Sequence, residues 1–330
     1  MTKLFLATGA CVVGLLVCEA IVRVLPDRWL PELAAVQPRQ LDIGSFARPS
    51  ANPVLHYELT PGRGEVNEAG YRGPRYPEEK PDSVLRVVAV GNSTAFGLGV
   101  EDAATYLRRL ESLLSATSGR PVQVVNLAVP GYNTEQELEM LRVRGLRFRP
   151  DLVILGYDHN DPKPILGRSR PPMPDDYGEN PFHSEFVRYL ARKFYVRPEL
   201  RLGKVDGHVT RGRQWDTHLE ALAGIGELCR REGVPVVAVV FDAWIQIEDR
   251  ETSRHYRALH APLQPIWSKG GFRVVDCYDL FQALMRERGW TDTKPLWVSI
   301  EPRDGHPNAE GHRLIADAVC RVVQDQGLLR

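Results

Sequence analysis

Ser93 and His306 are the two residues of this chain best suited to act as a nucleophile and its general base. A serine hydroxyl attacks an ester only when a base removes its proton, and histidine suits that role near neutral pH. Asp304 lies two residues before His306 and is the nearest carboxylate that could hold the imidazole in the required tautomer. Ser93 itself follows a β-branched run in the segment RVVAVGNSTAFGLGV, from Arg86 to Val100.

Two further segments carry donors that could stabilise the oxyanion formed during ester cleavage. NLAVPGYNT contains Gly131, and GYDHNDP contains Asn160. The backbone N–H groups of Ser93 and Gly131, together with the side-chain amide of Asn160, would supply three donors, which is what an acyl-transfer site needs. The sequence therefore predicts an oxyanion hole built from three separate segments.

Five apolar runs indicate the elements that must position these groups. They are continuous rather than alternating, as expected for strands buried on both faces of a parallel sheet. The runs are VLRVVAV (84–90), VQVVNLAV (122–129), DLVILGY (151–157), VPVVAVVF (234–241) and FRVVDC (272–277). Polar residues lie within a few positions after each of the first three runs. Ligands of such folds bind beyond the carboxyl ends of the strands.

Helical patterns fill the intervals between the runs. Leucines at 107, 110, 113 and 114 share one face, and Asn133 with Gln136 forms a capping-box pattern at the start of the next helix. Residues 216–232, 252–268 and 314–323 also show helical spacing. We expect an α/β fold in three layers, with a doubly wound, flavodoxin-like and mostly parallel five-stranded sheet.

Four segments of the chain, in this order, resemble the sequence blocks of the SGNH (GDSL-type) hydrolase superfamily. GNSTAFG resembles the first block with the nucleophile Ser93, and NLAVPGYNT the second with the oxyanion glycine Gly131. GYDHND resembles the third with the oxyanion asparagine Asn160, and DGHPNAEGHRLIA the fifth with the catalytic histidine His306. The resemblance covers residues 66–327 and extends to a bacterial subgroup with an N-terminal hydrophobic segment and a lead-in like VNEAGYRG.

The chain departs from this family pattern at two positions. Asn92 stands where the first block has aspartate, and the resemblance implies that this position supports the turn rather than the chemistry. The family has aspartate three residues before its histidine, where this chain has Arg303. Asp304 is therefore the candidate partner of His306, and Glu301 is a weaker one.

Other polar residues near these segments have simpler interpretations. We expect His312 to be structural in the last helix and Asp161, before Pro162, to shape its turn. Asp158 and His159 flank Asn160, and they either line the site or face solvent.

The first 25 residues predict a membrane anchor or a signal segment. Leu4–Cys18 is uncharged, and with its continuation it reaches the length that spans a bilayer core. An uncleaved anchor is the preferred interpretation, because no convincing cleavage site follows; a cleaved signal or a buried helix are the alternatives. We therefore expect a membrane-anchored, extracytoplasmic protein, periplasmic or on the cell surface, or alternatively a secreted one.

Three regions follow from these patterns. Residues 1–25 form the anchor or signal segment, 26–83 a proline-rich linker and lead-in, and 84–330 the hydrolase-like domain. An insertion at about 162–213 interrupts that domain. Its basic, amphipathic sequence suits either a lid or binding loop, or a helix that covers the core.

Composition narrows the class of function. The formal net charge is zero, which does not favour nucleic-acid binding, and the five scattered cysteines predict buried free thiols. No nucleotide-binding or zinc-protease motif is present, so we expect neither a cofactor nor a metal. The sequence predicts a serine esterase acting on acyl esters, with O-acetyl groups on an envelope polysaccharide or a lipid ester as substrate. An O-acyltransferase and a catalytically weak binding or assembly protein are the alternatives.

Overall fold

The computed structural model describes most of the chain from residue 46 onward. The continuous stretches are 46–158, 161–163, 213–241, 260–299 and 304–329, with residues 14, 17, 18, 20, 21, 204, 205, 208 and 209 in addition. The chain divides into two units, and all the predicted site residues lie in the second, Gly44–Leu166 with His208–Arg330. The following description concerns that unit.

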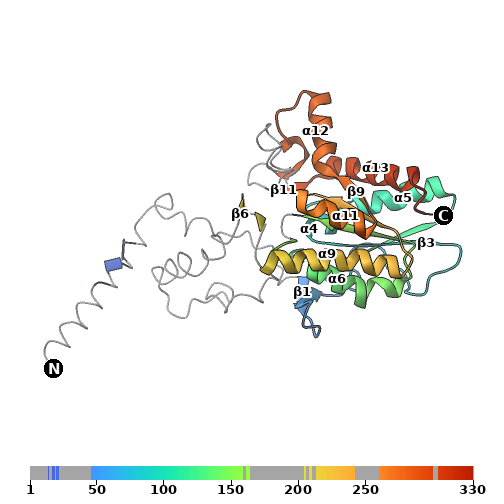
Figure 1. Cartoon of the computed structure of the whole chain (residues 1–330), viewed down its shortest axis with the longest axis horizontal. Coiled ribbons are helices and arrows are strands. Elements are labelled where there is room, and N and C mark those ends of the chain that lie inside the picture. The colour runs from blue at the N-terminus through green and yellow to red at the C-terminus, as the bar shows by residue number, and fades with distance from the viewer. Residues whose placement is uncertain are drawn as a thin grey trace. The chain divides into compact units, whose positions relative to one another are not determined.

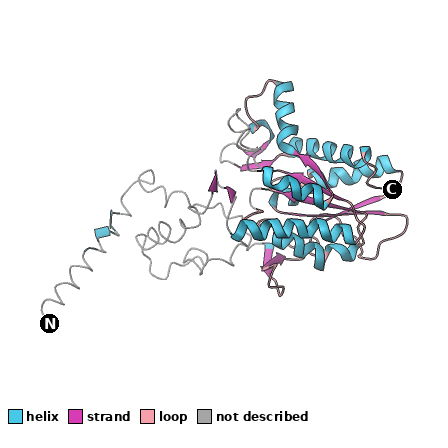
Figure 2. Cartoon of the chain, in the orientation of Figure 1, coloured by secondary structure: helices cyan, strands magenta, loops and turns pink. Residues whose placement is uncertain are grey.

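A five-stranded parallel sheet forms the centre of the unit (Figures 1 and 2). Its strands are β3 (Leu85–Gly91), β4 (Val122–Asn126), β5 (Leu152–Tyr157), β8 (Val236–Val240) and β9 (Phe272–Asp276). Their order is β4-β3-β5-β8-β9, and every neighbouring pair is parallel. The first strand in sequence is thus flanked by the second and third, which is the flavodoxin-like order predicted from the apolar runs.

Burial explains why these runs form strands. All residues of β3, β5 and β8 are buried. A β-branched residue fits the pleat of a sheet covered on both faces, so continuous valine-rich runs are stable there. The five predicted strands are confirmed, each within a few residues of its expected bounds.

Helices cover both faces of the sheet (Figure 1). α5 (Tyr106–Ser118) and α13 (Ala309–Asp325) pack against each other on one face, and α6 (Thr134–Val143), α9 (Arg213–Arg231) and α11 (Gln264–Gly270) pack side by side on the other. α12 (Cys277–Arg288) and the short α4 (Ser93–Phe96) are further α-helices of this unit. Single 3-10 turns span Asp102–Ala104, Gly145–Phe148, Ala261–Leu263 and Lys294–Leu296.

Short strands lie outside the central sheet. β1 (Ala47–Pro49) pairs antiparallel with β2 (Tyr57–Leu59), and β10 (Trp297–Ser299) pairs antiparallel with β11 (Asp304–Pro307). The two-residue strand β7 (His208–Val209) also belongs to this unit, whereas β6 (Lys204–Val205) belongs to the first unit. The described lead-in from Phe46 packs on the domain, and Leu55, Leu59 and Tyr71 join its core.

Several expectations differ from the structure or lie outside its described part. The sequence pattern did not predict α12, nor the strand β11 that carries His306, which was expected in a loop. Within 252–268, the described residues form a 3-10 turn at Ala261–Leu263 and then α11. Residues 1–25 and the insertion at 162–213 lie mostly outside the described residues. Among those that are described, no helix is both long and apolar enough to cross a bilayer.

The cysteine expectation holds for three residues. Cys229, Cys277 and Cys320 are free and buried. Burial raises the pKa of the Cys229 thiol to about 12, which leaves it protonated and inert at neutral pH.

Candidate active site

Ser93 lies at the start of α4, immediately after β3. The turn between them is tight: Gly91 has a φ of 156°, and a Cβ there would come within 2.6 Å of the Ala95 side chain. The Asn92 side chain caps α4 by accepting a hydrogen bond from the Thr94 N–H at 3.2 Å. The chain thus passes from β3 into α4 with only Asn92 between them, and Ser93 is partly exposed while Asn92 and Thr94 on either side of it are buried.

His306 meets Ser93 from a different element. Its Nε2 lies 2.9 Å from Ser93 Oγ, within hydrogen-bond distance. His306 lies on β11, which is positioned by antiparallel pairing with β10 and by Asn308, the N-cap of α13. The structure therefore brings together the serine and histidine that the sequence singled out, in the geometry of a nucleophile with its base.

Gly131 lies in the turn after β4. Its φ of 83° belongs to the left-handed region, which favours glycine. Asn133 follows and forms the predicted capping box with Gln136: the Gln136 N–H donates to Asn133 Oδ1 at 3.1 Å, and the Asn133 N–H donates to Gln136 Oε1 at 3.2 Å. Asn133 Nδ2 also donates to the Lys163 carbonyl at 2.8 Å, which ties this turn to the one after β5.

Asp158 and Asp161 hold the turn after β5. Asp158 is buried and accepts a hydrogen bond from the Thr94 hydroxyl at 2.7 Å, so it faces the interior rather than solvent. Asp161 accepts from the Asp158 N–H and from the Thr134 hydroxyl, the latter at 3.1 Å. Asp161 therefore shapes its turn, as expected. His159 and Asn160, between the two aspartates, lie outside the described residues.

A buried cluster of acids, Glu137, Asp158 and Asp161, lies next to the start of α4, where Asp158 accepts the hydrogen bond from Thr94. Glu137 is one helical turn from Thr134, is fully buried and neighbours Asp161, although neither of its carboxyl oxygens reaches hydrogen-bond geometry with a described residue. Burial raises the pKa of Glu137 well above its ordinary value, and the neighbouring Asp161 charge adds to the shift. Burial likewise raises the pKa of Asp161 to about 8.

Asn92 completes this cluster. Its Nδ2 donates to Asp161 Oδ2 at 3.5 Å, so an amide stands where a fourth carboxylate would meet the other three. The chain's departure from the family pattern at position 92 thus coincides with a site rich in buried acids. Sequence reasoning treated Asn92 as a turn support and did not identify Glu137, which looks like an ordinary polar residue of α6.

Asp304 and His312 complete the predicted set. Asp304 lies on β11 with His306, but its side chain lies outside the described part. His312 is buried, its ring stacks on Tyr106 with 5.9 Å between centroids, and its Nδ1 accepts the Tyr106 N–H at 3.2 Å. Burial lowers the pKa of His312 to about 3, so it is a neutral residue of the core.

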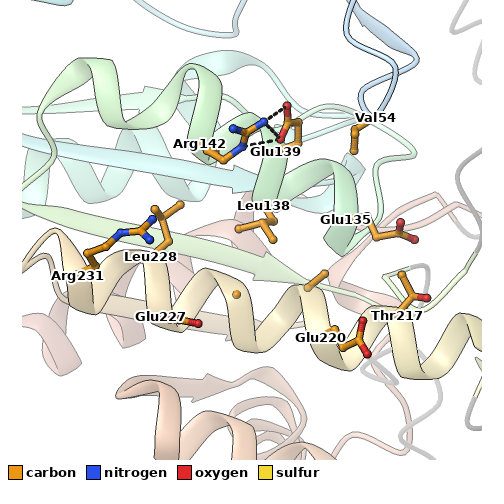
Figure 3. Close-up of a pocket in the computed structure, with 12 residues that line it drawn as sticks. Val54, Glu135, Leu138, Glu139, Arg142, Thr217, Glu220, Glu227, Leu228 and Arg231 are labelled. Atoms are coloured by element: carbon orange, nitrogen blue, oxygen red, sulfur yellow. Dashed lines mark hydrogen bonds and ion pairs between the residues drawn. The ribbon is translucent and has the colours of Figure 1, made fainter.

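A separate hollow lies away from Ser93. It is a groove of about 490 Å³ between α6 and α9, lined by Glu135, Leu138, Glu220 and Arg231 among others (Figure 3). Its lining contains neither Ser93 nor His306. The groove is therefore distinct from the candidate site.

Comparison with solved structures finds similar chains at low identity. TesA is 16% identical with a TM-score of 0.48, and the match covers 74% of this chain and 99% of that one. Axe2, an acetylxylan esterase from Geobacillus stearothermophilus, is 14% identical with a TM-score of 0.47, covering 72% and 94%. A comparison with curated proteins gives no match.

A family comparison covers the candidate site itself. The model of the GDSL-like lipase/acylhydrolase family matches residues 89–314, which is more than half of the chain. The matched region begins within β3, just before Ser93, and extends beyond His306 into α13. The chain belongs to the GDSL-like lipase/acylhydrolase family, a family of ester hydrolases.

Proposed function

We propose that this protein is a serine esterase in which Ser93 attacks the carbonyl carbon of an acyl ester. His306 takes the proton from Ser93 Oγ and passes it to the leaving alkoxide, which departs as an alcohol and leaves an acyl-enzyme. Water, deprotonated by His306, then attacks the acyl-enzyme and releases the carboxylic acid. The observation that carries this proposal is the 2.9 Å contact between His306 Nε2 and Ser93 Oγ.

The other roles come from the sequence and are part of the same proposal. The N–H groups of Ser93 and Gly131 and the amide of Asn160 stabilise the oxyanion. Asp304 orients the His306 ring and stabilises its protonated form. Replacing such a carboxylate by its amide lowers kcat by about 10⁴ where it performs this role. Asp304→Asn should therefore lower kcat by about that factor, whereas Glu301→Gln should lower kcat only slightly. A large fall in kcat for Glu301→Gln and a small one for Asp304→Asn would assign the role to Glu301.

A fluorophosphonate probe tests the reaction directly, because it modifies only an activated serine. Wild-type protein should be labelled, and Ser93→Ala and His306→Ala should not. Ser112→Ala is the matched control. Ser112 is exposed on α5, and its hydroxyl donates a hydrogen bond to the Arg108 carbonyl. This variant should be labelled like wild type. A folded wild type that resists labelling would favour a binding or assembly protein that keeps the fold.

The substrate class rests on the sequence alone. A basic insertion and an N-terminal apolar segment favour O-acetyl groups on an envelope polysaccharide, or a lipid ester. Incubating the protein with envelope extracts and measuring released acetate and fatty acid distinguishes the two. Supplying an acyl donor with and without a carbohydrate acceptor separates hydrolysis from transfer: acylated acceptor would favour the O-acyltransferase.

Membrane anchoring is also part of the proposal, and it too rests on the sequence alone. Leu4–Cys18 carries no charge, and this supports an anchor within residues 1–25. The full chain should stay with the membrane after alkaline extraction, and a chain lacking residues 1–25 should be released. An N-terminus found by mass spectrometry beyond residue 18 would indicate a cleaved signal instead, and with it a secreted protein.

A further inference from the structure

The lead-in before β3 places a buried arginine against the turn that carries Ser93. Arg72 belongs to the segment VNEAGYRG, and its side chain is fully buried. Nη1 donates to the carbonyls of Phe96 and Gly97 at 3.2 and 2.6 Å, and Nη2 donates to the carbonyl of Val100 at 2.5 Å. One side chain therefore holds three backbone carbonyls in the eight residues from Ser93 to Val100.

The rest of the segment holds Arg72 in place. Asn67 Oδ1 accepts the N–H groups of Ala69 and Tyr71 at 2.8 and 3.4 Å, and Asn67 Nδ2 donates to the Gly73 carbonyl at 2.9 Å. These bonds close a small loop whose glycines, Gly70 and Gly73, both have left-handed φ values, 76° and 97°. The loop is thus built to present one residue in a fixed position.

Pairing with the sheet places that residue beside the segment from Ser93 to Val100. Arg72 forms an antiparallel bridge with Asn126, the last residue of β4. Asn126 Nδ2 donates to the carbonyls of Ala95 and Phe96 at 3.3 and 3.4 Å, so both residues act on the same turn. The Arg72 guanidinium also lies 4.9 Å from the centre of the Phe96 ring.

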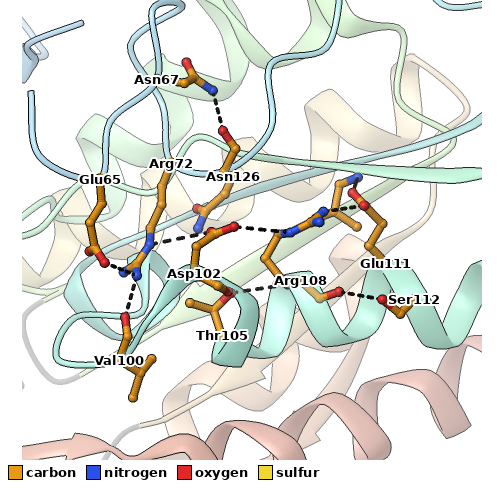
Figure 4. Close-up of polar contacts among 12 residues, drawn as sticks. Glu65, Asn67, Arg72, Val100, Asp102, Thr105, Arg108, Glu111, Ser112 and Asn126 are labelled. Carbon is orange, nitrogen blue, oxygen red and sulfur yellow. Dashed lines mark hydrogen bonds and ion pairs between the residues drawn. The ribbon is translucent and has the colours of Figure 1, made fainter. Parts of the chain in front are cut away.

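Acidic partners balance the buried charge. Glu65 accepts from Arg72 Nη2 at 2.8 Å, and Asp102 lies 3.7 Å from Nε (Figure 4). Figure 4 shows the guanidinium between Glu65, Asp102 and the Val100 carbonyl. The guanidinium of Arg72 is therefore held on one side by the backbone carbonyls that it binds. On the other side it is held by the carboxylates of Glu65 and Asp102.

We infer that Arg72 is a positioning residue, which holds the backbone after Ser93 so that Ser93 Oγ stays in line with His306 Nε2. This inference rests on the proposed role of Ser93 as nucleophile. α4 ends at Phe96, so the three carbonyls that Arg72 binds lie at its C-terminus and in the segment after it, where the helix supplies few donors. Removing Arg72 leaves these three carbonyls, two of them in buried hydrogen bonds, without this donor, and the segment shifts to find others.

The expected effect is on reaction rate rather than on substrate binding. A displacement of about 1 Å at the reacting groups can lower the rate about 10²-fold. Arg72→Met should lower kcat for a p-nitrophenyl ester by about this factor with little change in KM, and should slow fluorophosphonate labelling in parallel. Arg72→Lys keeps a cation but has no planar fork to span three carbonyls, so it should recover only part of the rate.

Arg86 provides a matched control. It is also a fully buried arginine, but it lies near the start of β3, whereas Ser93 follows the end of that strand. Its Nη1 donates to the Pro77 carbonyl, and its guanidinium lies over the rings of Tyr76 and Phe148. Arg86→Met should lower the thermal unfolding midpoint as Arg72→Met does, but it should leave kcat per folded molecule unchanged.

The outcomes separate this inference from the proposed function. Slow labelling by Arg72→Met beside normal labelling by folded Arg86→Met supports the inference. Labelling of folded Arg72→Met at the wild-type rate, or an equal loss in Arg86→Met, overturns it while the esterase proposal stands. A folded wild type that is not labelled overturns both. If Arg72→Met does not fold, the same comparison between Arg72→Lys and Arg86→Lys decides.

Discussion

His306 Nε2 lies 2.9 Å from Ser93 Oγ, although 213 positions separate the two residues in the chain. Each is positioned by its own element: Ser93 by the tight turn between β3 and α4, and His306 by the β10–β11 pair before α13. α4 and β11 are in contact, so these elements meet directly.

Groups that act as one unit should show non-additive losses when removed. We expect Ser93→Ala and His306→Ala each to lower kcat by about 10⁴–10⁶, and the double variant to be no slower than the worse single one. Steady-state kinetics on an activated ester measure this. Losses that multiply in the double variant would mean that the two residues act independently, which would contradict a shared proton transfer.

The fold could be predicted because the sequences of its strands are continuous apolar runs, which are typical of a parallel sheet with helices on both faces. α12 was missed although Cys277, Tyr278, Phe281 and Met285 have helical spacing and are buried. Cys277 had been assigned to the preceding strand, and this hid the start of the helix. The order of the strands followed from the strand–helix alternation and from the number of apolar runs.

The contact between Ser93 and His306 could be expected from the sequence, because Ser93 follows a strand of the sheet, where such folds bind ligands, and the family resemblance pairs it with His306. The cluster of Glu137, Asp158 and Asp161 could not be predicted from the sequence. Glu137 follows Thr134 on α6, and its burial against Asp161 depends on how α6 packs beside the turn after β5. Arg72 was within reach, since the lead-in VNEAGYRG was recognised, but its role depends on contacts that no spacing reveals.

Restoring the family residue at position 92 should harm this chain. Asn92 is buried with Nδ2 3.5 Å from Asp161 Oδ2, so Asn92→Asp adds a fourth acid to the cluster of Glu137, Asp158 and Asp161. We expect a loss of about 1–3 kcal/mol in the free energy of unfolding at pH 7, because a donor is replaced by a second acceptor. Urea unfolding measures it.

A second substitution should rescue that variant. Glu137→Gln removes one acid from the same cluster, so Asn92→Asp with Glu137→Gln should be more stable than Asn92→Asp alone by roughly 1 kcal/mol or more. Glu227→Gln is the control, because Glu227 is exposed on α9 and should rescue nothing. An Asn92→Asp variant as stable as wild type would show that the cluster tolerates a fourth carboxyl group.

The acid cluster should also make stability fall as pH rises. The pKa of Asp161 is raised from 3.8 to about 8, and that of Glu137 is raised well above 4.5. The folded protein therefore holds more protons than the unfolded chain from about pH 4 to about pH 8, and stability declines by up to about 1.4 kcal/mol per pH unit for each extra proton. Glu137→Gln should flatten this decline between pH 5 and 8 in urea unfolding, whereas a slope equal to that of wild type would place the protons elsewhere.

His312 should have the opposite effect on stability, because its contribution is lost as the pH falls. Burial, with a smaller contribution from Arg72, lowers its pKa from 6.5 to about 3. The unfolded chain therefore takes up a proton below pH 6.5 that the folded protein refuses, and stability is lost as pH falls from 6.5 towards 3, by up to about 1.4 kcal/mol per pH unit. His312→Gln keeps an acceptor for the Tyr106 N–H but cannot take that proton. We expect His312→Gln to be less stable than wild type at pH 7. Between pH 6.5 and 4, however, its free energy of unfolding should fall less than that of wild type. Unfolding curves of the two proteins that stay parallel over this range would show that other groups cause the acid loss.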